Sequence, residues 1–140
     1  MVFDTMVFVY ALLGVPPFRE DALAALDQAR EILVPDSFRA EFTNVLWQWV
    51  RNRNVPLDRA AELLRVPDRL ITDVVPTSLL DGEALRLAVS SDVAVYDTLF
   101  VSLAFRRRTK LITCDRELLR KFSDVAISPS DYIGSELTSG

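Results

Sequence analysis

Four acidic side chains of this 140-residue chain stand within or beside apolar runs, where carboxylates are uncommon. They are Asp4, Glu41, Asp97 and Asp115. A buried ionised carboxylate needs a hydrogen-bond donor or a cation beside it, because desolvation strongly disfavours its charge. If the fold brings these side chains to about 5 Å from one another, each pair repels by roughly 3 kcal/mol at an effective dielectric constant of about 20. Several such pairs together require a cation.

The ligand atoms indicate which cation this would be. Carboxylate oxygens select magnesium or manganese over zinc. Clustered aspartates that hold these ions serve phosphoryl chemistry. We therefore expect Mg²⁺ or Mn²⁺ as the cofactor of any site that these residues form.

Missing residue types exclude most other catalytic arrangements. The chain has no histidine and a single cysteine, Cys114. A Cys/His zinc site, a Ser-His-Asp triad, a Cys-His dyad and an internal disulfide are therefore excluded. The four glycines, at positions 14, 82, 134 and 140, cannot build a dinucleotide-binding turn or a phosphate loop. An enzyme made from this chain must work with carboxylates and a hard metal.

The positions of two of the acids can also be explained by the predicted strand or helix in which they lie, without a bound ligand. Asp4 interrupts the apolar run 1–10 and is either a ligand at the end of a strand or a cap of the next helix. Glu41 borders the apolar stripe of a helix expected over 37–53, where a glutamate on its own is often solvated. Asn44 follows Glu41 on the same helix face.

The other two acids lie near predicted helix starts. Asp97 falls with Val101 on the apolar face of a helix, or is the N-cap of that helix. Asp115 follows the apolar segment 110–113 and precedes a helical pattern, which is the signature of an N-cap after a parallel strand. Thr113 directs its hydroxyl to the same strand end.

Strand and helix patterns alternate along the chain. The run 1–10 is apolar almost throughout and predicts a central strand buried on both faces. Further strands are predicted at 32–35, 71–76, 110–113 and 124–128, with helical patterns between them. This order predicts an α/β fold with a mostly parallel sheet, whose ligands bind outside the carboxyl ends of the strands. Three of the four acids stand at or near those ends.

Length and composition predict one domain over residues 1–140, with a loose tail from about 134. The longest apolar stretch starts at Met6, is too short to span a bilayer and has no basic segment before it. We expect a cytoplasmic protein without membrane contact. A net charge of −4 argues against a polyanion partner, although the chain is locally basic from Arg106 to Lys121. This stretch is either a basic face or a helix end rich in cations.

Four segments resemble, in order and spacing, the motifs of PIN-domain nucleases. They are VFDTMVFVYALL, FRAEFTNVL, AVYDTLFVSLA and LITCDREL. The resemblance covers essentially the whole chain, and the length and early first aspartate are similar to the VapC-type toxins of toxin–antitoxin pairs. It implies a three-layer α/β/α fold and a metal-dependent ribonuclease, usually dimeric and blocked by a cognate antitoxin. Phe100 and Cys114 depart from the common pattern, but neither replaces a ligand.

The resemblance also assigns roles to particular residues. The acidic quartet of the family corresponds to Asp4, Glu41, Asp97 and Asp115, which would be the catalytic and metal-binding residues. The supporting residues that fix carboxylates and waters would be Thr5, Asn44 and Thr113. The candidates for contacts with the RNA backbone are Arg106, Arg107, Arg108 and Lys110.

Some alternatives remain. Trp47 and the amphipathic segment 57–65 would receive an antitoxin helix or a second subunit, or else form a packed helical hairpin. A phospho-acceptor receiver domain would need paired acids near the start and a lysine after a late strand, but Lys110 precedes its strand. An aspartate-nucleophile phosphohydrolase would need a second aspartate at Met6. The main rival is a catalytically inactive PIN fold that binds RNA or acts as a scaffold.

Overall fold

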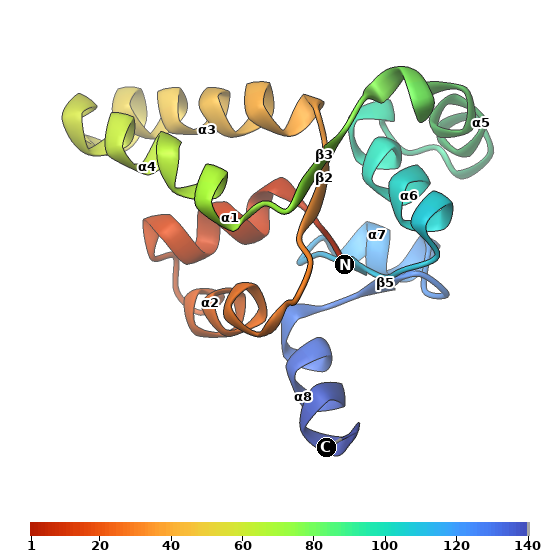
Figure 1. Ribbon diagram of the computed structural model, residues 1–140. Coiled ribbons are helices and arrows are strands. Elements are labelled where there is room, and N and C mark those ends of the chain that lie inside the picture. The colour runs from red at the N-terminus through yellow and green to blue at the C-terminus, as the bar shows by residue number, and fades with distance from the viewer. Residues whose placement is uncertain (140) are drawn as a thin grey trace.

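Five short strands form one parallel sheet at the centre of the molecule (Figure 1). The structure is a computed structural model that describes the backbone of residues 1–139 and the side chains of residues 1–135. The strand order is β3-β2-β1-β4-β5, and every neighbouring pair is parallel. The strands are β1 (Val2–Phe3), β2 (Leu33–Pro35), β3 (Asp73–Val75), β4 (Leu111–Ile112) and β5 (Ala126–Ile127). The predicted α/β class with a parallel sheet is confirmed.

Helices cover both faces of this sheet. They are α1 (Thr5–Leu13), α2 (Arg19–Gln28), α3 (Ser37–Arg53), α4 (Leu57–Leu70), α5 (Asp81–Ser91), α6 (Val95–Arg107), α7 (Arg116–Lys121) and α8 (Pro129–Ser139), with a 3₁₀ turn η1 (Thr77–Leu79). In Figure 1, α1 to α4 lie on one side of β2 and β3 and the pair α5 and α6 on the other. Helix α6 packs across β1, β2 and β4, while α3 packs on β2 and α1. These are the three layers of an α/β/α fold.

The predicted first strand is wrong beyond its start. Only Val2 and Phe3 are extended, and α1 begins at Thr5, directly after Asp4. Val7, Phe8 and Val9 are buried on successive sides of this helix. A helix that is apolar all round shows no amphipathic period, so its sequence resembles that of a buried strand. The short strand places Asp4 at the sheet edge instead of inside a strand.

The end of the chain is helical. Helix α8 extends to Ser139 and packs against α2, and the loose tail expected from about residue 134 stays a prediction. Gly140 lies outside the described residues. Within residues 1–139, no single helix is long and apolar enough to cross a membrane, and α5 and α6 meet that test only as a pair bent by 117°.

Helix α3 carries the second acid and shows how the sequence positions it. Phe38, Phe42 and Leu46 recur every four residues and are buried. Glu41 therefore lies beside the buried stripe, half-buried. The predicted packed hairpin is present, since α3 packs on α4 and Arg39 pairs with Asp68 at 2.6 Å across the two helices.

Candidate acidic site

The site lies at the point where the chain changes direction in the sheet. From β1 the chain moves outward through β2 to β3, then returns to pair β4 with the other side of β1. In parallel α/β sheets this switch point leaves a crevice outside the carboxyl ends of the strands. Here a cavity of about 170 Å³ lies at that place. Its lining residues are Asp4, Thr5, Met6, Tyr10, Glu41, Val45, Asp97, Cys114 and Asp115.

The structure thus brings all four predicted acids into one cavity, from four different segments. Asp4 follows β1, Glu41 is in the second turn of α3, Asp97 is in the first turn of α6 and Asp115 precedes α7. Each segment lies at the carboxyl side of the parallel sheet. Their catalytic and metal-binding roles stay predictions.

Asp4 is the buried member of the group, with 7 % of its surface exposed. It occupies the N-cap position of α1 but makes no side-chain capping bond. Instead its Oδ2 accepts a hydrogen bond of 2.7 Å from the buried hydroxyl of Thr113. Burial, together with the charges of Asp97 and Asp115, raises the pKa of Asp4 to about 6 although the Thr113 bond lowers it. The capping explanation is therefore not what holds this side chain.

Asp115 is exposed and is a true N-cap. Its Oδ1 accepts from the backbone N–H groups of Glu117 at 2.8 Å and Leu118 at 3.1 Å. Its own N–H donates to the Thr113 hydroxyl at 3.1 Å. Thr113 therefore joins the ends of β1 and β4, and the predicted supporting role of this hydroxyl matches its position. Both capping bonds use Oδ1, and Asp115 also lines the cavity.

Glu41 is the acid with the least satisfied carboxylate. Its Oε2 accepts from the Thr5 hydroxyl at 3.1 Å, while its Oε1 is buried and has no hydrogen-bond partner among the described residues. Burial raises its pKa to about 7, with further contributions from the charges of Asp4 and Asp97. A buried carboxylate oxygen without a partner is unfavourable unless a cation or a water completes it.

Asp97 is not the N-cap of its helix, contrary to one of the two predictions. The N-cap is Ala94, and the Asp97 N–H already donates to the Ala94 carbonyl at 3.0 Å. Asp97 stands in the first turn, where the helix dipole favours a negative charge. Burial and the charges of Asp115 and Glu117 nevertheless raise its pKa. The helix start thus holds a carboxylate at the cavity without using it as a cap.

The arrangement fits a hard divalent cation. The polar lining is rich in carboxylate oxygens, which magnesium and manganese prefer. Burial and, to a smaller extent, the charges of neighbouring acids raise three of the pKa values, and a positive charge in the cavity would offset both effects. Within the described part of the chain, no three acidic or cysteine side chains are placed so that they would hold one ion together. Magnesium in proteins commonly uses one or two carboxylates and keeps several waters, so it does not need three carboxylates together.

Cys114 also lines the cavity but contributes no anion. Burial, with the charges of Asp4 and Asp21, raises the pKa of its thiol to about 11. The thiol therefore stays protonated near neutral pH and is a poor metal ligand. The site keeps its oxygen character.

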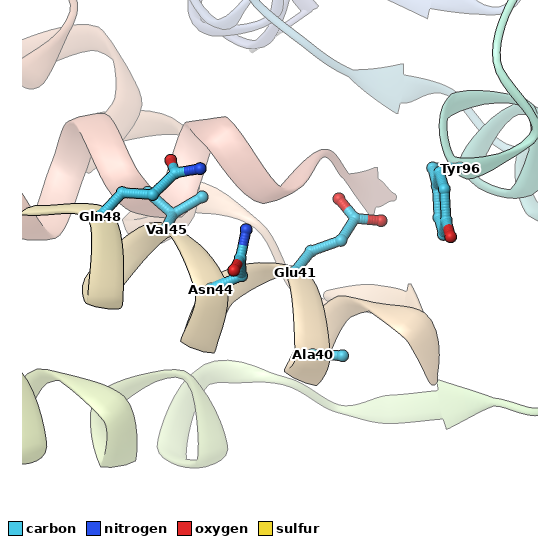
Figure 2. Close-up of a pocket in the computed structure, with 6 residues that line it drawn as sticks. All are labelled: Ala40, Glu41, Asn44, Val45, Gln48 and Tyr96. Atoms are coloured by element: carbon cyan, nitrogen blue, oxygen red, sulfur yellow. The ribbon is translucent and has the colours of Figure 1, made fainter.

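Two groups of predicted residues lie outside the cavity. Asn44 is exposed on α3 and lines a neighbouring groove instead (Figure 2). Arg108 and Lys110 line a hollow beside Met1, at the amino ends of the strands and so at the opposite edge of the sheet.

The rest of the basic segment is partly engaged in the fold. Arg107 pairs with Asp73 at 2.5 Å, and Lys110 donates to the Asp124 carbonyl at 2.8 Å. Arg106 is exposed in the last turn of α6. The structure therefore does not bring these cations to the acids, and their contact with RNA stays a prediction.

Sequence reasoning missed Tyr96 and Gln48, which line the groove that holds Asn44. Gln48 follows Asn44 by one helical turn, so its place on that face was readable from the spacing. For Tyr96, the only sequence signal is a large aromatic residue directly before a candidate ligand. Its exposure depends on how α6 packs, which local sequence does not encode.

These features define a class: a three-layer α/β/α domain with a parallel sheet and a carboxylate site at its switch point. Residues 1–126 match the family model of the PIN domain. Ribonuclease VapC3 from Pyrobaculum aerophilum is 34 % identical over 115 residues, which are 80 % of this chain and 88 % of that protein. The chain belongs to the PIN-domain family, and within it resembles the VapC type.

Solved structures share the fold. The crystal structure of PAE2754 from Pyrobaculum aerophilum matches with a TM-score of 0.76 and 22 % identity, over 99 % of this chain and 89 % of that one. VapBC2 from Rickettsia felis, bound to a DNA fragment from its promoter, matches with a TM-score of 0.62 and 15 % identity, over 91 % of this chain and 98 % of that one.

Proposed function

We propose that this protein is a metal-dependent endoribonuclease and the toxin of a toxin–antitoxin pair. The observation that carries the proposal is the convergence of Asp4, Glu41, Asp97 and Asp115 on one small cavity at the switch point of the sheet. Membership of the PIN-domain family and the likeness to a ribonuclease support the choice of RNA as substrate.

Asp4, Asp97 and Asp115 would hold Mg²⁺ or Mn²⁺, at least one of them through a bound water, with Glu41 binding directly or through a water. When bound, such an ion would supply positive charge against the charge that develops on the phosphate and would lower the pKa of a bound water. Glu41, which lines both the acidic cavity and the adjoining groove, would orient this water. Thr113 and Thr5 hold the carboxylates of Asp4 and Glu41 in place.

The partners follow from the same proposal. The likeness to the VapBC2 structure supports a cognate antitoxin as a partner. The exposed Trp47, with 54 % of its surface accessible, is a candidate contact for that antitoxin or for a second copy in a homodimer. A cytoplasmic location remains our expectation.

The test is a cleavage assay with pure protein freed of any co-purifying partner. Mixed RNAs are incubated with Mg²⁺ or Mn²⁺, with EDTA as one control and Glu41→Gln as the other. We expect metal-dependent internal cleavage by the wild type and a loss of at least about a hundredfold in the variant, as for removal of a catalytic acid or base. Absence of cleavage of any RNA with either metal would instead identify an inactive PIN fold that binds RNA or acts as a scaffold.

A further inference from the structure

A second, larger depression adjoins the acidic cavity. It has a volume of about 460 Å³ and is lined by Ala40, Glu41, Asn44, Val45, Gln48 and Tyr96. Glu41 and Val45 line both this groove and the acidic cavity, so the two are continuous. If a phosphate of a polymer lay at the acids, the next unit of that polymer would lie in this groove.

One wall of the groove is the ring of Tyr96. Figure 2 shows it across from the side chains of Asn44 and Gln48, with the carboxylate of Glu41 between them. Tyr96 is 68 % exposed, although it directly precedes Asp97 in the first turn of α6. No aromatic ring among the described residues stacks on it, whereas Tyr10 stacks on Phe18 at 4.7 Å between ring centroids. Its face is open to a planar ligand.

The other wall carries two amides. Asn44 and Gln48 are one turn apart on α3, and both are exposed on the groove side. Figure 2 shows their amide groups on the same side of the helix as the carboxylate of Glu41. Each amide offers both a hydrogen-bond donor and an acceptor.

The charge of the lining indicates which part of a nucleotide fits. Glu41 is the only ionisable acid or base besides the Tyr96 phenol among the six lining residues. An anionic phosphate would meet a carboxylate and no cation there. A neutral base fits better, because it can stack on an aromatic face and pair its edge with amides.

We infer that this groove is a nucleoside subsite for single-stranded RNA, in which one base next to the phosphate at the acidic cavity stacks on Tyr96, while Asn44 and Gln48 on the opposite wall form hydrogen bonds with the adjoining nucleotide. The inference rests on the proposed function, since it takes RNA as the ligand. Stacking on Tyr96 accepts every base, so it adds affinity without sequence preference. The two amides would supply whatever base preference the groove has.

The first experiment measures binding rather than cleavage. A fluorescent, mixed-sequence single-stranded RNA is titrated in EDTA with the Asp115→Asn protein, in which one repelling charge is removed outside the groove. We expect Tyr96→Ala in this background to weaken binding by about tenfold, and Tyr96→Phe to stay within about twofold because the ring remains. Val89→Ala is the control, since Val89 is an exposed apolar residue of α5 that does not line the groove.

The second experiment separates a base from a backbone contact. The same variants are titrated with an oligomer of ribose and phosphate that lacks bases. Tyr96→Ala should have no effect on the binding of this oligomer. The oligomer has no base to stack on the ring, so removal of the ring takes away nothing further. An equal loss with this oligomer would overturn the inference.

Other outcomes are equally decisive. Unchanged RNA binding by Tyr96→Ala, or no RNA binding by the Asp115→Asn protein, would overturn the subsite. If Tyr96→Ala weakened the binding of a protein partner but not of RNA, the groove would be a protein-binding surface and the inference would be overturned. If the wild type cleaves no RNA but Tyr96→Ala still weakens RNA binding, the proposed catalytic function fails and the subsite stands.

Discussion

The hydroxyl of Thr113 donates a hydrogen bond of 2.7 Å to the carboxylate of Asp4, a residue 109 positions earlier in the chain. The same hydroxyl accepts from the N–H of Asp115 at 3.1 Å. A single buried side chain therefore fixes two of the four acids relative to each other. It does so by linking the ends of β1 and β4, the two strands at the switch point.

Replacement of Thr113 by valine should damage stability and the acid side of the pH profile together. Valine has nearly the same side-chain shape as threonine but no hydroxyl. The buried Asp4 carboxylate therefore loses the donor Thr113, and the Asp115 N–H loses its acceptor. We expect a fall of about 1–3 kcal/mol in the free energy of unfolding, measured by denaturant titration. The pKa of Asp4 should rise above about 6, so the acidic limb of the cleavage rate should move to higher pH.

Thr98→Val is the matched control for that experiment. Thr98 is fully buried in α6, and its hydroxyl donates to the Ala84 carbonyl at 2.7 Å, away from the acidic cavity. It should lose comparable stability with no change in the pH profile. If both variants show the same pH profile as the wild type, Thr113 has only a structural role.

Asp115 caps α7 and places a charge at the cavity, and different substitutions should separate these two roles. Asparagine can still cap α7, so Asp115→Asn should keep its free energy of unfolding within about 0.5 kcal/mol of the wild type. Alanine cannot accept the bonds from Glu117 and Leu118, so Asp115→Ala should lose about 0.5–2 kcal/mol. Both should lose RNA cleavage, because both remove the charge at the cavity. Full activity of Asp115→Asn would show that this residue is a cap and nothing more.

The sequence predicted the parallel sheet and the four acids because those features are local. Strands β2 to β5 are short apolar segments that polar or turn residues delimit, and Asp115 stands where an N-cap is expected. Helix α1 was predicted as a strand because Val7, Phe8 and Val9 are all buried, which removes the amphipathic period. The length of the apolar run 1–10 would by itself have favoured a helix over a strand.

Other features depend on contacts that local sequence does not encode. Acids are favoured both at the N-cap and in the first turn, so the pattern around Asp97 could not tell the two positions apart. The bond between Thr113 and Asp4 joins distant segments. The groove between Tyr96 and α3 forms only when α6 and α3 are placed against the sheet. The residues of the site were thus readable from the sequence, but the shape of the site was not.

Without metal, stability should fall as pH rises from about 4 to about 7. Asp4 and Glu41 have ordinary pKa values of 3.8 and 4.5, which the fold raises to about 6 and about 7. The folded state therefore binds more protons than the unfolded state in this window, so their contribution is fully present below about pH 4 and lost above about pH 7. For the buried Asp4 the loss is about 2–3 kcal/mol, and for the more exposed Glu41 it is smaller.

Denaturant titrations in EDTA across this pH range provide the measurement. Asp68 and Glu117, whose ion pairs lower their pKa values, act in the opposite direction, so variants must be compared. Asp4→Asn should flatten the pH dependence relative to the wild type. Asp27→Asn, at an exposed position of α2, should leave it unchanged. A wild type and an Asp4→Asn protein with parallel pH curves would contradict the raised pKa of Asp4.

Asp97→Asn should change the response to metal more than it changes the fold. Burial and the charges of Asp115 and Glu117 raise the pKa of Asp97, so a neutral amide removes repulsion. We expect the metal-free Tm to be unchanged or up to roughly 4 °C higher. Added Mn²⁺ should raise the Tm of the wild type by mass action but raise that of the variant much less, and RNA cleavage should disappear.

Asp81→Asn distinguishes this result from a simple helix-start effect. Asp81 is also an acid in the first turn of a helix, but it is exposed on α5 and lies outside the cavity. Its loss should lower the metal-free Tm slightly, because the helix dipole favours a charge there, and should leave the Mn²⁺ shift intact. If Asp97→Asn instead melts several degrees lower without metal, responds fully to Mn²⁺ and still cleaves RNA, then Asp97 only stabilises the start of α6. The two variants together thus decide whether the charge at Asp97 serves the helix or the metal.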